Sequence, residues 1–194
     1  MKNTHPVIRF FNYHFGTEIT NSQEEQVLSL YRRESVKRKN LLFRQGDINA
    51  RHYIIEKGLL RLYLIDPKGK EINILFAKEN QVIGDLATPE PTDFYLEATE
   101  DSIVYSIEDK DLESIIEFLD ISYKFDNTLL RRSYVHIQKR LVSILSNSAE
   151  ENYLEFQRKH PDLIQRLPQY HIAAFLGISP EFLSKIIAKT AREK

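Results

Sequence analysis

The sequence contains no cysteine and no tryptophan, and only one methionine among its 194 residues. Without cysteine the chain has no disulfide, no thiolate nucleophile and no Cys-ligated zinc or iron–sulfur site. It also lacks any run of about 18–20 apolar residues, the length that a membrane-spanning helix needs. The N-terminal stretch is interrupted by Arg9, Asn12 and His14 and has no small-residue cleavage site, unlike a secretory signal. We therefore expect a cytoplasmic protein with no membrane partner.

The chain as a whole also lacks an excess of charge of one sign, because its formal net charge is −1. The stretch from Arg166 to Lys194 differs, with five basic and two acidic residues and hence a local charge of +3, which leaves −4 for the rest. A small basic module attached to a neutral carrier is typical of proteins whose nucleic-acid contacts are confined to one domain.

Within the first two thirds of the chain, the sequence pattern changes near residue 36 from helical to strand-like. Residues 18–35 are predicted to be helical, since Ser22 and Glu25 have the spacing of a capping box. Residues 36–107 then show short apolar runs separated by turn residues at intervals of roughly 8–12, as in an antiparallel barrel or sandwich.

Turn residues mark the ends of these predicted strands. The clearest turns are Arg44–Asp47 (RQGD) and Asp66–Gly69 (DPKG), and Pro89 and Pro91 mark a loop. Four glycines fall at apparent turns, where a positive φ costs glycine little: Gly46, Gly58, Gly69 and Gly84.

After Ile107 the pattern is helical. Ser106 and Asp109 resemble a helix start, and a long helix is predicted from about Tyr123 to Ser146. Five apolar residues recur along it at spacings of four and three, as in a heptad seam: Leu130, Tyr134, Ile137, Leu141 and Ile144. Periodicity alone allows two interpretations, a dimer seam or a stripe packed against the chain's own barrel. Ser148 with Glu151 predicts the next helix, so a domain boundary is placed near Asn147.

The most specific local pattern is a helix-turn-helix at Gln169–Thr190. A short apolar helix is predicted to end at Gly177, a residue type favoured just after a helix. Ser179 is a favourable N-cap and Pro180 suits the first position of the second helix. A generic helical hairpin is the alternative interpretation of this segment.

A helix-turn-helix would place the start of its second helix in the major groove of DNA. Glu181 could accept a hydrogen bond from a cytosine amino group, and Lys185 could donate to guanine. Ser179, Gln169 and Lys189 suit phosphates. The predicted DNA-binding residues are Gln169, Ser179, Pro180, Glu181, Ser184, Lys185 and Lys189.

The combination of these three parts resembles the CRP/FNR superfamily over nearly the whole chain. The stretch from Lys39 to Leu86 matches the cyclic-nucleotide-binding fold, the long helix matches the family's dimer helix, and Gln169–Lys189 matches its helix-turn-helix without a gap. The resemblance implies an α+β fold: a sensor domain at residues 1–121 forming an antiparallel β-roll or jelly-roll barrel, a dimerisation helix at 122–146, and a helix-turn-helix domain at 147–194. The resemblance favours the dimer-seam interpretation of the long helix. It implies a homodimeric transcription regulator whose partner is double-stranded DNA, with RNA polymerase as a further candidate partner.

One part of the family pattern is missing. Members that bind cAMP carry a Gly-Glu-Leu turn and, further on, an arginine that neutralises the cyclic phosphate. Here the turn is Gly84-Asp85-Leu86, and Thr92 and Asp93 occupy the arginine's region. No Arg or Lys lies between Lys78 and Lys110. A buried phosphate without a cation is strongly disfavoured, so cAMP is not expected to bind in the family manner and the effector is unknown.

Other cofactors and functions are less well supported. The absence of cysteine excludes the family's iron–sulfur sensing, and no histidine is singled out as a haem ligand. A cupin-like metal enzyme would need more ligands than His52 and Glu56 can provide, so no metal site and no enzyme activity are predicted. A ligand-binding or interaction protein of the same fold that does not bind DNA is the remaining alternative.

Overall fold

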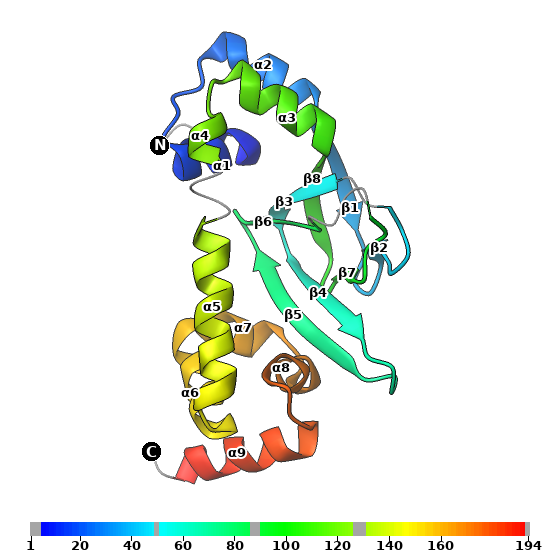
Figure 1. Cartoon of the computed structure of the whole chain (residues 1–194), viewed down its shortest axis with the longest axis vertical. Helices are drawn as coiled ribbons and strands as arrows, with labels where there is room; N and C mark the ends of the chain where they lie inside the picture. Colours follow the sequence, from blue (N-terminus) through cyan, green and yellow to red (C-terminus); the bar gives the residue numbers. More distant parts are fainter. Residues whose placement is uncertain (1–4, 49–50, 86–89, 126–130, 193–194) are drawn as a thin grey trace. The chain divides into compact units, whose positions relative to one another are not determined.

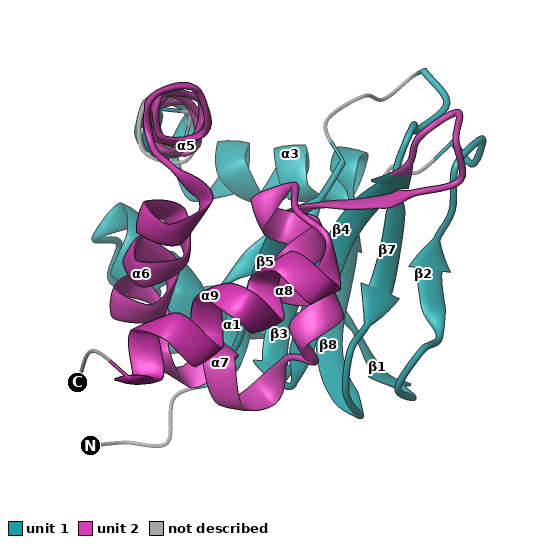
Figure 2. Ribbon diagram, turned by 90° about the horizontal axis from the view of Figure 1, so that it is seen from below, with its two compact units in different colours: residues 1–64, 75–132 teal, residues 65–74, 133–194 magenta. Residues whose placement is uncertain are grey.

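The computed structural model describes residues 5–48, 51–85, 90–125 and 131–192. These residues form two compact units, residues 1–64 with 75–132 and residues 65–74 with 133–194 (Figure 2). The second unit therefore contains the long helix, the C-terminal helices and the tip of one β-hairpin. The functional division into sensor, dimer helix and DNA-binding domain stays a prediction.

Unit 1 begins with two helices, α1 (Pro6–Phe15) and α2 (Asn21–Ser29) (Figure 1). Pro6 occupies the first turn of α1, where its missing N–H is not needed, and the His5 ring accepts a hydrogen bond from the Val7 N–H at 3.3 Å. The apolar face of α1 belongs to a core cluster shared with β-strands and with α3. Its buried residues are Val7, Ile8, Phe10, Phe11 and Phe15.

The predicted helix over residues 18–35 is wrong in its bounds. The structure ends α2 at Ser29 and makes Arg32–Val36 the strand β1. The capping box is also displaced: Thr20 caps the helix and Gln23 returns to the Thr20 N–H at 3.0 Å. Thr20 and Gln23 satisfy the same spacing rule as Ser22 and Glu25, so spacing alone does not distinguish the two pairs.

Within the described part of the roll, eight strands form two sheets. Their order is β1-β8-β3-β6 in one sheet and β2-β7-β4-β5 in the other. The strands after β1 are β2 (Leu41–Phe43), β3 (Arg51–Lys57), β4 (Leu59–Ile65), β5 (Glu71–Lys78), β6 (Val82–Gly84), β7 (Tyr95–Ala98) and β8 (Ser102–Glu108). The β1–β8, β3–β8, β3–β6, β2–β7 and β4–β7 pairs are antiparallel, as predicted for a β-roll.

Glycine is required where β3 turns into β4. Gly58 has φ +107°, and a Cβ atom there would lie 2.1 Å from the Ser102 hydroxyl oxygen. Gly46 and Gly69 also have positive φ, in agreement with their predicted turns. Gly84 does not lie in a turn, since it is the last residue of β6 and pairs with His52.

Helix α3 (Asp109–Phe118) follows β8 directly. Ser106 is not its cap, because it lies within β8 and its hydroxyl is bonded to the Glu34 carboxylate; the N-cap position is Glu108. A short helix, α4 (Ser122–Phe125), ends the described part of unit 1.

The described residues of unit 2 form five helices together with the hairpin tip at residues 65–74. The helices are α5 (Arg131–Ser146), α6 (Ala149–Lys159), α7 (Pro161–Arg166), α8 (Gln169–Leu176) and α9 (Pro180–Arg192). The predicted capping box of α6 is confirmed: the Ser148 side chain accepts from the Glu151 N–H, and Glu151 accepts from the Ser148 N–H at 2.7 Å. Among the described residues no single helix is long and apolar enough to cross a membrane; only the bent pair α8–α9 passes that test, by length and composition.

Candidate functional site

The helix-turn-helix is formed by α8 and α9. The two helices are bent by 101° with respect to each other, and Gly177, Ile178 and Ser179 connect them. Gly177 adopts the left-handed conformation with φ 73°, and its N–H bonds to the Ala173 carbonyl. An angle of about 90–120° and a short turn containing glycine are the defining geometry of this motif.

The second helix begins as the sequence predicts. Its first residue is Pro180, and the Ser179 side chain accepts a hydrogen bond from the Phe182 N–H at 3.2 Å. Leu183 and Ile186 are buried, whereas the predicted DNA-binding residues of this helix are exposed. These exposed residues are Pro180, Glu181, Ser184, Lys185 and Lys189.

The exposure of Phe182 identifies it as a further candidate DNA-binding residue, which the sequence pattern did not indicate. Phe182 is 49% exposed although it is aromatic, and it lies in the first turn of α9 beside Glu181. The carboxylate of Glu181 accepts hydrogen bonds from its own backbone N–H and from Ser179, and these hold its pKa below the usual value. Glu181 is therefore ionised and acts only as an acceptor at neutral pH.

Two of the predicted phosphate-binding residues have partners within unit 2. Gln169 is exposed at the start of α8, with its Oε1 3.5 Å from the Ser184 hydroxyl. The Lys189 ammonium forms an ion pair with Glu150 of α6 at 2.7 Å. Lys189 is thus linked to the fold of the unit as well as being exposed on α9.

The described part of the predicted seam is exposed. Tyr134, Ile137, Leu141 and Ile144 are 62%, 64%, 55% and 55% exposed, and α5 contains no buried residue. Val142 and Leu145, which lie outside the predicted heptad, are 62% and 76% exposed and widen this apolar surface. Leu130 lies outside the described residues.

The predicted ligand-pocket residues occupy two segments of unit 1. Gly84 ends β6, and Asp85, which follows it, is only 8% exposed. Thr92 is buried, and its backbone pairs with the turn at Arg44–Asp47: its carbonyl accepts from Gly46 and its N–H donates to Asp47, both at 2.9 Å. Asp93 is exposed, and Leu86 lies outside the described residues.

The roll contains one buried, strongly bonded arginine. Arg61 is 3% exposed and is the only Arg or Lys that is buried within the described ranges. Its guanidinium bonds to both oxygens of Glu97 at 3.1 and 3.2 Å and lies 3.8 Å over the ring of Tyr63. Its charge is therefore already neutralised by a carboxylate of the neighbouring strand.

The two residues considered as cupin-like metal ligands have different partners. His52 Nε2 lies 2.8 Å from Asp109, and burial lowers the pKa of His52. Glu56 is bonded to Arg33 at 2.8 and 3.0 Å. Within the part of the chain that the structure describes, no group of three or more potential metal ligands occurs.

Unit 2 also contains a half-buried arginine that the sequence analysis did not single out. Arg140 of α5 donates to the carbonyls of Ile74, Asn73 and Phe175, the latter two at 3.0 Å, and lies 3.8 Å over the Phe175 ring. Asn73 in turn donates to the His171 carbonyl at 2.8 Å. The hairpin tip, α5 and α8 are thereby joined. Burial lowers the pKa of Arg140 to about 10, so the guanidinium stays charged at neutral pH.

Comparison with known proteins agrees with this geometry. Residues 33–117 match the family model of the cyclic nucleotide-binding domain. No curated protein matches the sequence.

Several solved structures have the same fold over most of the chain. FixK2 from Bradyrhizobium japonicum has a TM-score of 0.73 at 16% identity, with 84% of this chain and 85% of that one covered. A CRP/FNR-family regulator from Eubacterium rectale has a TM-score of 0.68 at 15% identity, covering 90% and 84%. The c-di-GMP-responsive global regulator CLP from Xanthomonas campestris has a TM-score of 0.66 at 14% identity, covering 90% and 93%.

The fold and the family match together define the class: the chain has the α+β fold of the CRP/FNR regulators, with a cyclic nucleotide-binding-like β-roll and C-terminal helices. The fold that the resemblance implies is thereby confirmed. The structures from Xanthomonas campestris and Eubacterium rectale are both named as regulators.

Proposed function

We propose that the protein is a sequence-specific, DNA-binding transcription regulator. The observation that carries this proposal is the arrangement of α8 and α9, bent by 101° around a glycine-containing turn, with the polar face of α9 exposed. A helix presented in this way fits the major groove, while the preceding helix crosses the DNA backbone.

The first turns of α9 supply the base contacts in this proposal. Lys185 is exposed and donates to guanine O6 or N7, whereas the Glu181 carboxylate accepts from the amino group of cytosine. The exposed ring of Phe182 adds an apolar group that suits the methyl of thymine. Gln169, Ser179 and Lys189 contact phosphates and fix the register of the helix on the duplex.

We propose that α5 forms the dimer interface. Four apolar side chains at heptad spacing, each more than half exposed, are unfavourable in water and would be buried against the same helix of a second copy. A symmetric dimer would hold two recognition helices about 34 Å apart, one turn of DNA, and would bind a palindrome.

The barrel is proposed not to bind cAMP in the family manner. The arginine that would neutralise the phosphate is absent from the region of Thr92 and Asp93, and Arg61 is already bonded to Glu97. A cyclic phosphate would be desolvated without a free cation, which costs several kcal/mol. The effector, if the barrel takes one, is then of a different chemistry, and RNA polymerase remains a candidate partner from the family resemblance alone.

Selection from a random-sequence DNA pool tests the proposal. The purified full chain is incubated with the pool at fixed salt, with and without cAMP, and bound DNA is sequenced. Enrichment of a palindrome independent of cAMP is the expected result. Enrichment only with cAMP would contradict the assignment of the barrel. Absence of enrichment under both conditions would favour a ligand-binding or interaction protein of the same fold.

A further inference from the structure

A cavity of about 110 Å³ lies among α5, α6 and α8 within unit 2. A single water needs about 10–15 Å³ by the same kind of measure, so this cavity has room for a small organic molecule. It is not the barrel pocket of the cyclic nucleotide-binding domain, because all of its lining residues belong to unit 2.

The floor of the cavity is apolar and aromatic. The rings of Phe156 and Phe175 lie 5.3 Å apart at 51°, and Ile144 and Leu176 extend the apolar surface. Phe156 is only 4% exposed and is therefore held by the core of the unit. A flat apolar group would be buried against these rings with little loss of side-chain freedom.

The polar lining carries an excess of positive charge. Lys139, Arg140 and Lys159 line the cavity, and Glu155 is its one carboxylate. With the histidines neutral, the lining has a net charge of +2. Burial and the neighbouring cations Arg140, Lys159 and Lys139 lower the pKa of His136, which also lines the cavity, and the cations disfavour adding a further positive charge.

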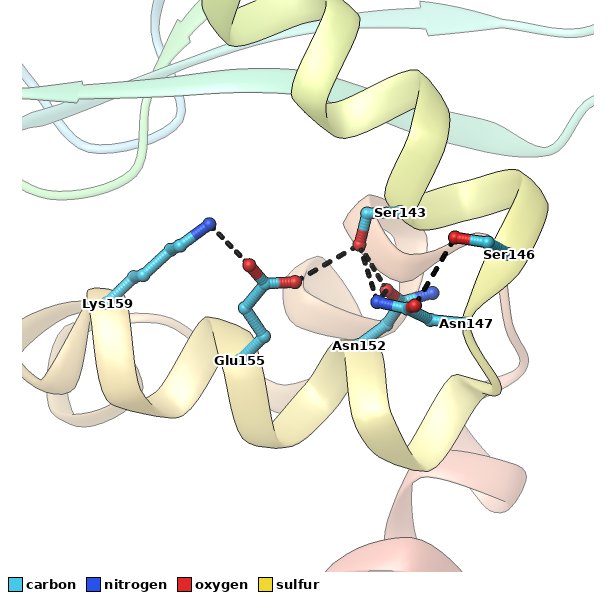
Figure 3. A network of polar contacts seen from close by, with 6 residues as sticks. All are labelled: Ser143, Ser146, Asn147, Asn152, Glu155 and Lys159. Atoms are coloured by element: carbon cyan, nitrogen blue, oxygen red, sulfur yellow. Dashed lines mark hydrogen bonds and ion pairs between the residues drawn. The ribbon is translucent and has the colours of Figure 1, made fainter.

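Two of these charges, Lys159 and Glu155, belong to a polar network between α5 and α6 (Figure 3). Glu155 pairs with Lys159 at 2.5 Å, and the Ser143 hydroxyl lies 3.2 Å from Glu155 and 2.5 Å from Asn152. The hydrogen bond from Lys159 holds the pKa of Glu155 below its usual value. Lys139 differs, since it makes no hydrogen bond or ion pair to any described residue. Of the two cations that Glu155 does not neutralise, Arg140 is held by backbone carbonyls, and Lys139 is therefore the one left to pair with an anion.

The dimer proposed through α5 would leave this cavity accessible. Residues two positions apart on an α-helix are turned by about 200°, so Lys139 and Ser143 lie on the side opposite to the seam residue Leu141. Only Ile144 belongs to both surfaces.

We propose that this cavity is a binding site for a small carboxylate with a flat apolar body. The carboxylate would pair with the Lys139 ammonium, and the apolar body would lie on the Phe156 and Phe175 rings. A charge-assisted bond gives selectivity for anions, and the aromatic floor gives selectivity over acetate-sized ligands. A bound ligand would contact α8 through Phe175, whose ring and carbonyl also contact the Arg140 guanidinium. This inference does not rest on DNA binding.

The test uses 4-fluorobenzoate as the probe and the intact chain. Binding is followed by ¹⁹F NMR line broadening, with 4-fluorobenzamide as the neutral analogue of the same shape. We expect a Kd of about 1 mM for the benzoate, as is usual for a ligand of this size, and at least fivefold weaker binding of the benzamide.

A matched pair of variants locates the site. Lys139→Gln should weaken benzoate binding roughly fivefold or more, because the charge-assisted contact is lost. Arg131→Gln removes another exposed cation of α5, one that does not line the cavity, and it should have no effect. Equal binding of benzoate and benzamide, equal effects of the two variants, or no binding at 10-fold the expected Kd would each overturn the proposal.

Discussion

The exposed seam of α5 gives a prediction whose size follows from the structure. Leu141 is 55% exposed in the single chain. Full burial of a leucine side chain is worth about 2 kcal/mol, so roughly 1 kcal/mol remains to be gained by each protomer when α5 pairs. Leu141→Ala removes this gain twice in a symmetric dimer, a loss of about 2 kcal/mol. The dimer dissociation constant should therefore rise about 30-fold.

Sedimentation velocity over a concentration series measures that constant directly. Leu154→Ala is the matched control, because Leu154 is also a partly exposed leucine, 40% exposed, but lies on α6. It should leave the dissociation constant unchanged. A monomer at all working concentrations in the unmodified protein, or equal effects of the two variants, would refute the assignment of α5 as the dimer helix.

Three further predictions follow from single residues. Lys185→Ala should weaken DNA binding by about 1–3 kcal/mol at one base position of each half-site, whereas Lys189→Ala should weaken binding to all DNA sequences alike. Titration of a set of single-base site variants separates the two effects, and a sequence-selective loss for Lys189→Ala would contradict its phosphate role. Gly177→Ala should destabilise the helix-turn-helix by about 1–2 kcal/mol, because alanine is strained at φ 73° although no atom would meet its Cβ; a melting temperature equal to that of the unmodified protein would show that the turn tolerates a side chain. The Arg33 hydrogen bond holds the pKa of Glu56 below its usual value, so this pair should stabilise the fold above about pH 4.5 and lose that contribution as the pH falls through the lower folded pKa; Glu56→Gln should remove this part of the acid dependence in denaturant titrations, and an unchanged acid limb would argue against the pair.

The helix-turn-helix was predictable because its determinants are local. The stop at Gly177, the cap at Ser179 and the inward Leu183 each follow from backbone and burial preferences of a few adjacent residues. The capping box at Ser148 and Glu151 is predictable for the same reason. The angle of 101° between α8 and α9 is the one feature of the motif that these local preferences do not predict.

The errors lie where distant contacts decide the structure. Arg32–Val36 becomes a strand because it pairs with Ser102–Ser106, more than sixty residues away in the chain. The local sequence of Arg32–Val36 does not indicate this pairing. Ser106 is likewise held in β8 by that pairing and by Glu34 rather than capping a helix. Helix α1, in contrast, has a local pattern that predicts it, the helical spacing of Val7, Phe10, Phe11 and Phe15, which are buried.

The cavity in unit 2 could not be predicted from the sequence. Its lining comes from three helices. Arg140 lies outside the heptad seam, and the sequence alone predicts a solvent-exposed charge at this position. Its role depends on carbonyls of Asn73 and Ile74 in the hairpin tip, which are far away in the chain. Exposure of Phe182 is equally a property of the folded unit, since an aromatic residue in an amphipathic helix is usually predicted to be buried.

The most direct test of the central claim is the dependence of DNA binding on half-site spacing. The palindrome recovered from the random pool is compared with one that has five extra base pairs between its half-sites, about half a helical turn, at fixed salt. A symmetric dimer with two recognition helices about one turn apart predicts two protomers per duplex and loss of specific binding to the longer site. Equal affinity for both spacings, or one protomer per duplex, would contradict a dimeric regulator that reads DNA through α9.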